Sequence, residues 1–168
     1  IEQEKQKELL EAAYEFIKTK QIQSIRISTR PDYIDKEKLK LLKKYGVKTI
    51  ELGVQSTNDY ILKKCKRGHT FEDVKKASKL IRKHGFVLGH QMMIGLSEST
   101  KIDELNTAKD LAKLKPKIVR LYPVLVIKGT ELEKEYQNGE YEPIPLSQAV
   151  ERCKELYYFF TNKKITVI

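Results

Sequence analysis

Residues 50–70, IELGVQSTNDYILKKCKRGHT, indicate how the whole chain is organised. The stretch opens with a short apolar run typical of a strand, residues 49–54, and the run stops at the polar side chain of Gln55. A short helical segment follows, and Arg67 precedes a helix cap at Thr70. In parallel α/β folds, ligands bind at the carboxyl ends of the strands. We therefore expect the Gln55 amide and the Arg67 guanidinium to border a site for a small polar ligand.

Outward from this stretch, apolar runs and helical stripes alternate along the chain. The runs predict strands at residues 22–28, 47–54, 86–94, 118–127 and 165–168, the fourth interrupted at Pro123. The stripes predict a helix within residues 1–20, one between the cap Asp35 and Gly46, a helical turn after Asn58, and helices at 71–84, 103–114, 128–137 and 147–161, the last capped by Ser147. This alternation predicts an α/β fold with a parallel sheet and right-handed crossovers. Five strands are too few for an eight-stranded barrel, so we expect an open, TIM-like partial barrel.

Length, charge and cysteine content narrow the class of protein. The 168 residues suit one domain, and the sequence has neither a signal peptide nor an apolar run of about 18 residues that could span a membrane. The formal charge of +10 permits nucleic-acid binding, although lysines on solvated helix faces explain it as well. Cys65 and Cys153 form no metal-binding spacing, so we expect no metal site and a reducing, cytoplasmic location.

The ends of the sequence suggest a fragment of a longer protein. The chain starts inside a helical pattern without an initiator methionine, and it ends on a strand-like run at residues 165–168. If neighbouring strands are missing, residues 22–28 become a sheet edge with unpaired backbone groups. We expect this edge to self-associate, to exchange strands or to be covered by the N-terminal helix.

Five sequence motifs in a fixed order resemble one enzyme family. They are RPDY at 30–33, ELGVQS at 51–56, RGHT at 67–70, the pair Met92 and Met93, and YPVLVIKGT at 122–130. Together they resemble the radical S-adenosylmethionine domain of the Elongator catalytic subunit and its short bacterial relatives. The GVQS and RGHT motifs are also similar to oxygen-independent coproporphyrinogen III oxidase. The resemblance covers residues 22–141.

The resemblance implies a partial barrel that holds S-adenosylmethionine and a [4Fe-4S] cluster. In this family a CxxxCxxC triad binds the cluster, an electron passes to the sulfonium, and a 5′-deoxyadenosyl radical abstracts hydrogen from the substrate. The triad and the glycine-rich motif that follows the second strand are absent here. Residues 1–168 would thus be one domain, the C-terminal portion of a barrel truncated at its N-terminal side. We expect this portion to be catalytically silent on its own.

The same resemblance assigns roles to individual residues. Gln55 aligns with a glutamine that contacts the adenosyl ribose, and Arg67 with an arginine that meets the methionine carboxylate. Gln91 stands where the coproporphyrinogen oxidases have an aspartate, and Ser28 where relatives often have a carboxylate. The expected cofactor-binding residues are therefore Gln55, Arg67, Gln91, Ser28, Tyr122 and Val124. The loop usually written GLPGET reads GLSEST at residues 95–100.

Two classes of function follow. The first is part of a radical S-adenosylmethionine enzyme whose substrate is a tRNA wobble uridine, favoured by the RPDY and YPVLVIKGT motifs, or a porphyrinogen or another small molecule. The second is a non-catalytic module that binds RNA through the basic surface. His69 and His90 are interpreted as turn or packing residues rather than catalysts.

Overall fold

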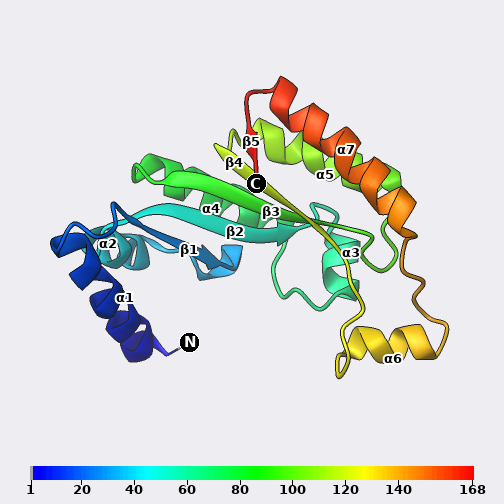
Figure 1. Ribbon diagram of the computed structural model, residues 1–168, viewed down its shortest axis with the longest axis horizontal. Coiled ribbons are helices and arrows are strands. Elements are labelled where there is room, and N and C mark those ends of the chain that lie inside the picture. Colours follow the sequence, from blue (N-terminus) through cyan, green and yellow to red (C-terminus); the bar gives the residue numbers. More distant parts are fainter. Residues whose placement is uncertain (1) are drawn as a thin grey trace.

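The computed structural model describes residues 2–168 and contains a five-stranded parallel sheet in the order β1-β2-β3-β4-β5 (Figure 1). The strands are β1 (Ile25–Thr29), β2 (Val47–Gln55), β3 (Val87–Ile94), β4 (Ile118–Pro123) and β5 (Thr166–Val167). The helices are α1 (Gln3–Lys18), α2 (Lys36–Lys44), α3 (Asp59–Lys64), α4 (Phe71–Lys83), α5 (Lys101–Lys113), α6 (Glu131–Gln137) and α7 (Leu146–Asn162), with a 3-10 turn, η1 (Pro31–Tyr33). The predicted open, parallel α/β sheet is confirmed: strand order is linear, and the described residues do not close a barrel.

The interior strand β2 has two different faces. Ile50, Leu52 and Val54 are fully buried in the hydrophobic core, as their alternation predicts. Glu51 and Gly53 point to the other face, where they pair in register with Gly89 and Gln91 of β3. The sheet therefore has one apolar face covered by helices and one inner face that carries polar side chains.

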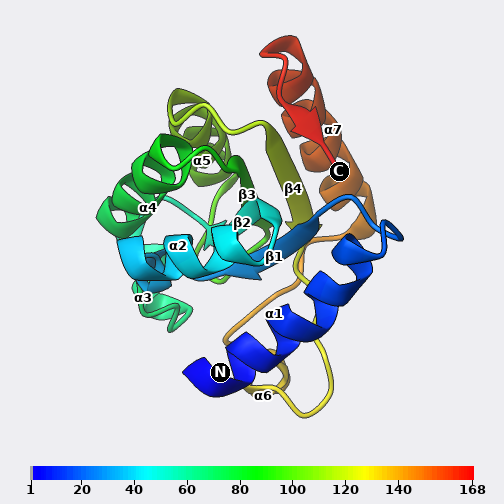
Figure 2. The same ribbon diagram turned by 90° about the vertical axis from the view of Figure 1, so that its left-hand side faces the viewer.

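Helices cover the apolar face in sequence order. Figure 2 shows α2, α4 and α5 following one another around that side of the sheet. Their starts are fixed by local chemistry, because Asp35 accepts a hydrogen bond from the Lys38 N–H, and Thr70 and Thr100 each form a capping box with the aspartate three residues later. The caps predicted at Asp35 and Thr70 are confirmed.

The hydrophobic core runs through nearly the whole chain. It includes Leu10 of α1, Leu39 of α2 and Ile81 of α4, and it continues into Leu156 and Phe160 of α7. Helix α6, in contrast, has no buried residue and stands apart from the sheet near the ends of the strands (Figure 1).

Several predicted boundaries were wrong. Strand β4 ends at Pro123 rather than at residue 127. Proline has no N–H group to donate to the neighbouring strand. The Val124 N–H donates one last hydrogen bond to Ile94 O, and the chain then leaves the sheet. Ser147 does not cap α7, because Pro145 occupies the cap position and the helix begins at Leu146. Residues 22–24 lie before β1, which begins at Ile25.

The edge strand β1 pairs with β2 alone among the described residues. Helix α1, strand β1 and helix α2 border a groove that is lined by Leu9, Leu10, Ile27, Ser28 and Leu41, among others. Self-association through the edge stays a prediction. Within residues 2–168, none of the helices combines the length and the apolar character needed to cross a membrane.

Candidate functional site

Gln55 ends β2 in an unusual backbone conformation. Its φ is +70°, and the Ser56 N–H bonds back to Val54 O at 2.9 Å, which closes a three-residue turn. The ladder shifts register here, with Gly53 opposite Gln91 and Gln55 opposite Met92. A side chain in the left-handed region costs on the order of 1 kcal/mol or more, and such strain gathers at functional sites. The turn brings the Gln55 side chain back over Gly53.

Three polar side chains converge on the space above Gly53. A Cβ added to Gly53 would lie 3.2 Å from Gln55 Nε2, 3.5 Å from Arg67 Nη2 and 3.8 Å from Gln91 Oε1. Glycine keeps this space free because it has no side chain. Gln55 Oε1 and Arg67 Nε are buried and have no hydrogen-bond partner among the described residues. Buried polar groups normally have partners, so two unpaired atoms in side chains that converge on one space mark that space as a candidate ligand site.

The loop that carries Arg67 is held by two distant residues. Arg30 donates a hydrogen bond to Gly68 O at 3.0 Å, and this contact joins the RPDY and RGHT motifs. The same guanidinium forms a bidentate ion pair with Asp32. The His69 Nε2 lies 3.2 Å from Val54 O, at the strand end beside Gln55. Burial and the nearby charge of Arg30 lower the pKa of Arg67 from its ordinary value. An anion beside Arg67 would stabilise the charged guanidinium and so counteract this lowering of the pKa.

Gln91 and Ser28 belong to the same cluster. The Gln91 Nε2 donates to Ser28 Oγ at 3.1 Å and to Glu51 Oε2 at 3.0 Å. The predicted residues Gln55, Arg67 and Gln91 are thus brought together, and Ser28 contacts them through Gln91 rather than directly. Arg67 and Gln91 are half-buried, and Ser28 is exposed on the edge strand.

The other two predicted residues lie further along the sheet. Tyr122 pairs with Met93 in the β3–β4 register, two residues beyond Gln91, and the Arg120 guanidinium lies 5.8 Å from the Tyr122 ring centre. Val124 is buried, and its backbone N–H is used by Ile94 O. Neither side chain is among the three nearest to a Cβ placed on Gly53. Their assignment to an adenine contact stays a prediction.

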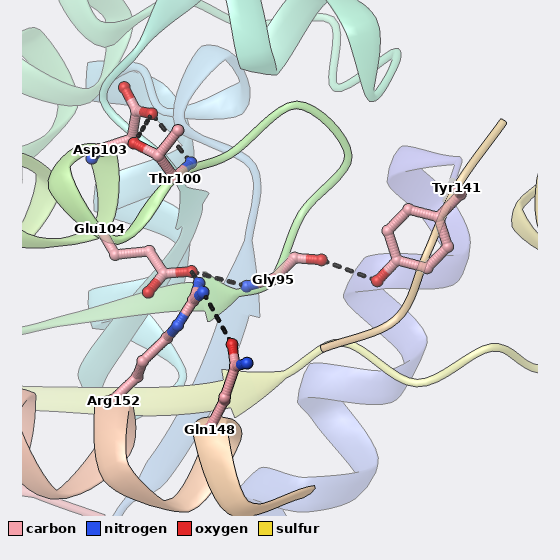
Figure 3. Close-up of polar contacts among 7 residues, drawn as sticks. All are labelled: Gly95, Thr100, Asp103, Glu104, Tyr141, Gln148 and Arg152. Atoms are coloured by element: carbon pink, nitrogen blue, oxygen red, sulfur yellow. Dashed lines mark hydrogen bonds and ion pairs between the residues drawn. The ribbon is translucent and has the colours of Figure 1, made fainter. Parts of the chain in front are cut away.

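The GLSEST loop after β3 is anchored at its first residue (Figure 3). The buried Glu104 of α5 accepts from the Gly95 N–H at 2.8 Å and from Arg152 of α7 at 3.1 Å. Tyr141 donates to Gly95 O at 2.8 Å from the opposite side. Burial raises the pKa of Glu104 despite the contacts of Gly95 and Arg152, which work against the rise. The segment after residue 138 therefore helps to hold this loop. The GLSEST sequence alone did not predict the conformation of the loop.

The described residues hold no group of three or more His, Cys, Asp or Glu side chains arranged to bind a metal ion. Cys65 and Cys153 are free and half-buried, and burial raises the pKa of each thiol. Neither cysteine therefore has the features of a reactive thiolate.

Sequence reasoning missed two groups that shape the site. Glu51 and Arg120 face the inner side and bond to each other, with Arg120 Nε 3.2 Å from Glu51 Oε2. The sequence did contain a signal for this pair: a glutamate inside an otherwise apolar strand requires a charged or hydrogen-bonding partner. Arg30, quoted only as part of a motif, was not assigned its role in holding Gly68. That contact joins residues 38 positions apart in the chain and is visible only in the folded structure.

The backbone at Gln55 yields a prediction on stability. We expect Gln55→Gly to be more stable than Gln55→Ala by about 1 kcal/mol, because glycine adopts positive φ without the cost that alanine bears. Both variants lose the amide, so they form a matched pair for ligand binding. Urea unfolding followed by circular dichroism measures the difference. A Q55A protein as stable as Q55G would mean that the turn is not strained.

Comparison with known proteins places the chain in a family context. The sequence profile of the Radical SAM superfamily matches residues 2–111, and that of the Radical_SAM C-terminal domain matches residues 116–168. The chain is 38% identical over 128 residues to the tRNA uridine(34) acetyltransferase of Methanocaldococcus jannaschii, covering 74% of this chain and 24% of that protein. It is 34% identical over 132 residues to the human Elongator complex protein 3, covering 76% and 24%. The chain spans about a quarter of the length of these relatives.

Solved structures agree with the sequence comparisons. The archaeal Methanocaldococcus infernus Elp3 with an N-terminal deletion superposes with a TM-score of 0.75 at 35% identity, covering 79% of this chain and 32% of that one. The coproporphyrinogen III oxidase HemN of Escherichia coli, a radical SAM enzyme, superposes with a TM-score of 0.68 at 19% identity, covering 83% and 32%. The second likeness is one of fold.

Proposed function

This chain belongs to the Radical SAM superfamily, and from that premise we propose that it forms the S-adenosylmethionine-binding part of an enzyme that modifies a tRNA uridine. The observation that carries the proposal is the convergence of Gln55, Arg67 and Gln91 above Gly53. Gln55 ends β2, Gln91 lies in the second half of β3, and Arg67 lies in the loop after α3, so they gather toward the carboxyl side of the sheet, where parallel sheets bind ligands.

The residues present fit the cofactor. Arg67 offers a guanidinium whose Nη2 borders the space above Gly53, which suits the carboxylate of the methionine part. Gln55 and Gln91 offer an amide donor and an amide acceptor, which suit ribose hydroxyls. When bound, S-adenosylmethionine supplies the 5′-deoxyadenosyl group for radical hydrogen abstraction. The chain's own contribution is to bind and orient that molecule and to hold the Arg67 loop through Arg30 and His69.

The residues present do not fit an iron–sulfur cluster. Cys65 and Cys153 are the two cysteines in the sequence, and a cluster of this family needs three in one motif. We therefore assign no electron-transfer step to these residues. We propose that residues 1–168 are a single domain, the C-terminal portion of a partial barrel, and that cluster ligands come from outside it. On this proposal the chain alone makes no 5′-deoxyadenosine.

The tRNA substrate is proposed from the relatives and from the charge of the surface. Relatives that are more than a third identical are named tRNA uridine(34) acetyltransferases. Lys63 and Lys64 are exposed on α3, between β2 and the Arg67 loop, in a chain of net charge +10. Cations beside the site suit a phosphate backbone. We place the enzyme in the cytoplasm, where Cys65 and Cys153 stay reduced.

The carboxylate contact is tested by pairing a variant with a truncated ligand. We expect Arg67→Ala to weaken binding of S-adenosylhomocysteine about 10- to 100-fold, as expected when a charge-assisted contact worth about 1.5–3 kcal/mol is lost. Binding of 5′-methylthioadenosine, which lacks the carboxylate, should change little. Isothermal titration calorimetry of the 168-residue chain measures both. Arg67→Lys should recover part of the loss because it keeps the charge without the fork.

The control variant is Arg82→Ala, which removes an arginine from α4 that bonds to Leu114 O on the outer surface. It should bind both ligands as the unmodified chain does. Equal losses for both ligands in R67A, or no binding by the unmodified chain, would contradict the proposed site. The radical reaction is tested anaerobically after a cysteine-triad segment is restored upstream: 5′-deoxyadenosine should form, and more of it when tRNA is added. No product from a chain with an intact cluster would contradict the proposed enzyme.

A further inference from the structure

Glu51 is a buried carboxylate on the inner face of the sheet. Its side chain is 2% exposed, and it sits where Gly89 of β3 leaves room, since a Cβ on Gly89 would lie 2.7 Å from Glu51 Cγ. Arg26 of β1 and Arg120 of β4 each reach it at 3.2 Å. Burial opposes ionisation of Glu51, but the hydrogen bonds of Gln91 and Arg120 and the charges of both arginines outweigh it and lower the pKa. Glu51 is thus held as an anion, which can only accept hydrogen bonds.

This anion decides which way the Gln91 amide points. Gln91 lies 3.0 Å from Glu51 Oε2, and because the carboxylate cannot donate, the amide must turn its nitrogen toward it. The second N–H of the same nitrogen goes to Ser28 Oγ at 3.1 Å. Both donors of Gln91 are then used. Its carbonyl oxygen is left facing the space above Gly53, beside the donors of Gln55 and Arg67.

We propose that Glu51 is a positioning residue that fixes Gln91 as a hydrogen-bond acceptor for a ligand hydroxyl above Gly53. This inference rests on the proposed function for the identity of the ligand, whose ribose hydroxyls both donate and accept. The site then offers each kind of partner: donors from Gln55 and Arg67 and one acceptor from Gln91. An unfixed amide could turn its nitrogen toward the ligand and remove the acceptor that Gln91 provides.

The decisive variant removes the charge and keeps the shape. In Glu51→Gln, the new amide can offer Gln91 either an oxygen or a nitrogen, so Gln91 is no longer fixed. Glu155→Gln, which breaks an exposed ion pair with Lys101, is the matched control.

Binding is measured by calorimetry with S-adenosylhomocysteine and with its analogue that has hydrogen in place of both ribose hydroxyls. The unmodified chain should prefer the hydroxylated ligand. E51Q should lose about five- to tenfold of that preference, the expected size for one hydrogen bond, while E155Q should keep it. A merely structural Glu51 would weaken both ligands equally. Full preference in E51Q, or equal weakening of both ligands, overturns the inference.

A second readout needs no ligand. In ¹⁵N NMR spectra the side-chain amide protons of Gln91 should be protected from exchange with solvent in the unmodified chain, because Ser28 and Glu51 both accept from them, and they should lose protection in E51Q. Freely exchanging protons in the unmodified chain would overturn the inference. The two proposals fail separately: no binding of either ligand by the unmodified chain counts against the proposed function, whereas the NMR signal decides the orientation of Gln91 by itself.

Discussion

Replacing Phe160 with alanine is expected to lower the free energy of unfolding of the whole chain by about 3–5 kcal/mol. The ring lies at the end of α7, is fully buried, and belongs to the same hydrophobic cluster as Leu39 and Ile81 of α2 and α4. Truncation leaves a cavity between α7 and the sheet that the packed core cannot refill. Because the core is shared, we expect one cooperative transition rather than the separate loss of α7.

Urea unfolding and hydrogen exchange followed by mass spectrometry measure this effect. In F160A, peptides from β2 and β3 should lose protection together with those from α7, since a single domain opens as a unit. Tyr158→Ala is the matched control, because Tyr158 is on the same helix but 55% exposed, and it should cost less than about 1 kcal/mol. Protection that is lost in α7 alone, with β2 and β3 unchanged, would show that residues after the Radical SAM match fold as a separate unit.

Acid is expected to destabilise the chain through His90 more than through any surface histidine. His90 of β3 is fully buried against α4, where its Nε2 lies 2.9 Å from Ser78 Oγ, and burial lowers its pKa to about 3. In the unfolded chain a histidine has a pKa of about 6.5. The folded state therefore binds fewer protons between these values, and the stability that the neutral ring contributes is lost as the pH falls below about 6.5. Each pH unit costs about 1.4 kcal/mol, or roughly 3 kcal/mol between pH 7 and pH 4.

Comparison with His90→Gln isolates this contribution. The glutamine amide can reach the Ser78 hydroxyl but cannot take up a proton, so H90Q should lose roughly 3 kcal/mol less than the unmodified chain between pH 7 and pH 4. At pH 7 the variant should be modestly less stable because glutamine fills the ring's space poorly. Urea unfolding at each pH unit gives the two profiles, and all other titrating groups are common to both. Parallel profiles would mean that His90 already titrates normally in the folded chain.

Sequence patterns predicted those elements whose cause is local. The alternation of Ile50, Leu52 and Val54 and the caps at Asp35 and Thr70 are confirmed, because strand burial and helix capping depend on neighbouring residues. The predicted end of β4 at residue 127 was wrong because the path of the chain beyond the sheet does not depend on neighbouring residues alone. An apolar sequence continued past Pro123, but after one last bond to Ile94 the chain turns away from the sheet.

The cap predicted at Ser147 failed in the same way. Serine is a good cap in isolation, but α7 begins one residue earlier, behind Pro145, whose fixed φ suits a helix start. Of the six predicted cofactor residues, Gln55, Arg67 and Gln91 converge and Ser28 contacts Gln91, while Tyr122 lies elsewhere on the sheet and Val124 follows its fourth strand. The motifs alone did not say which of these side chains come together, and their role in cofactor binding stays a prediction.

The sequence by itself determined the order of strands and helices, the parallel sheet and the stretch that carries Gln55 and Arg67, because these follow from periodicity, capping and chain order. Only the tertiary structure decided how the polar groups act on one another. Arg30 reaches Gly68, Glu51 fixes the Gln91 amide, and Tyr141 and Glu104 hold Gly95, each across a strand or a helix layer. Such contacts join residues far apart in the chain, and their geometry is set by the shared core rather than by any local pattern.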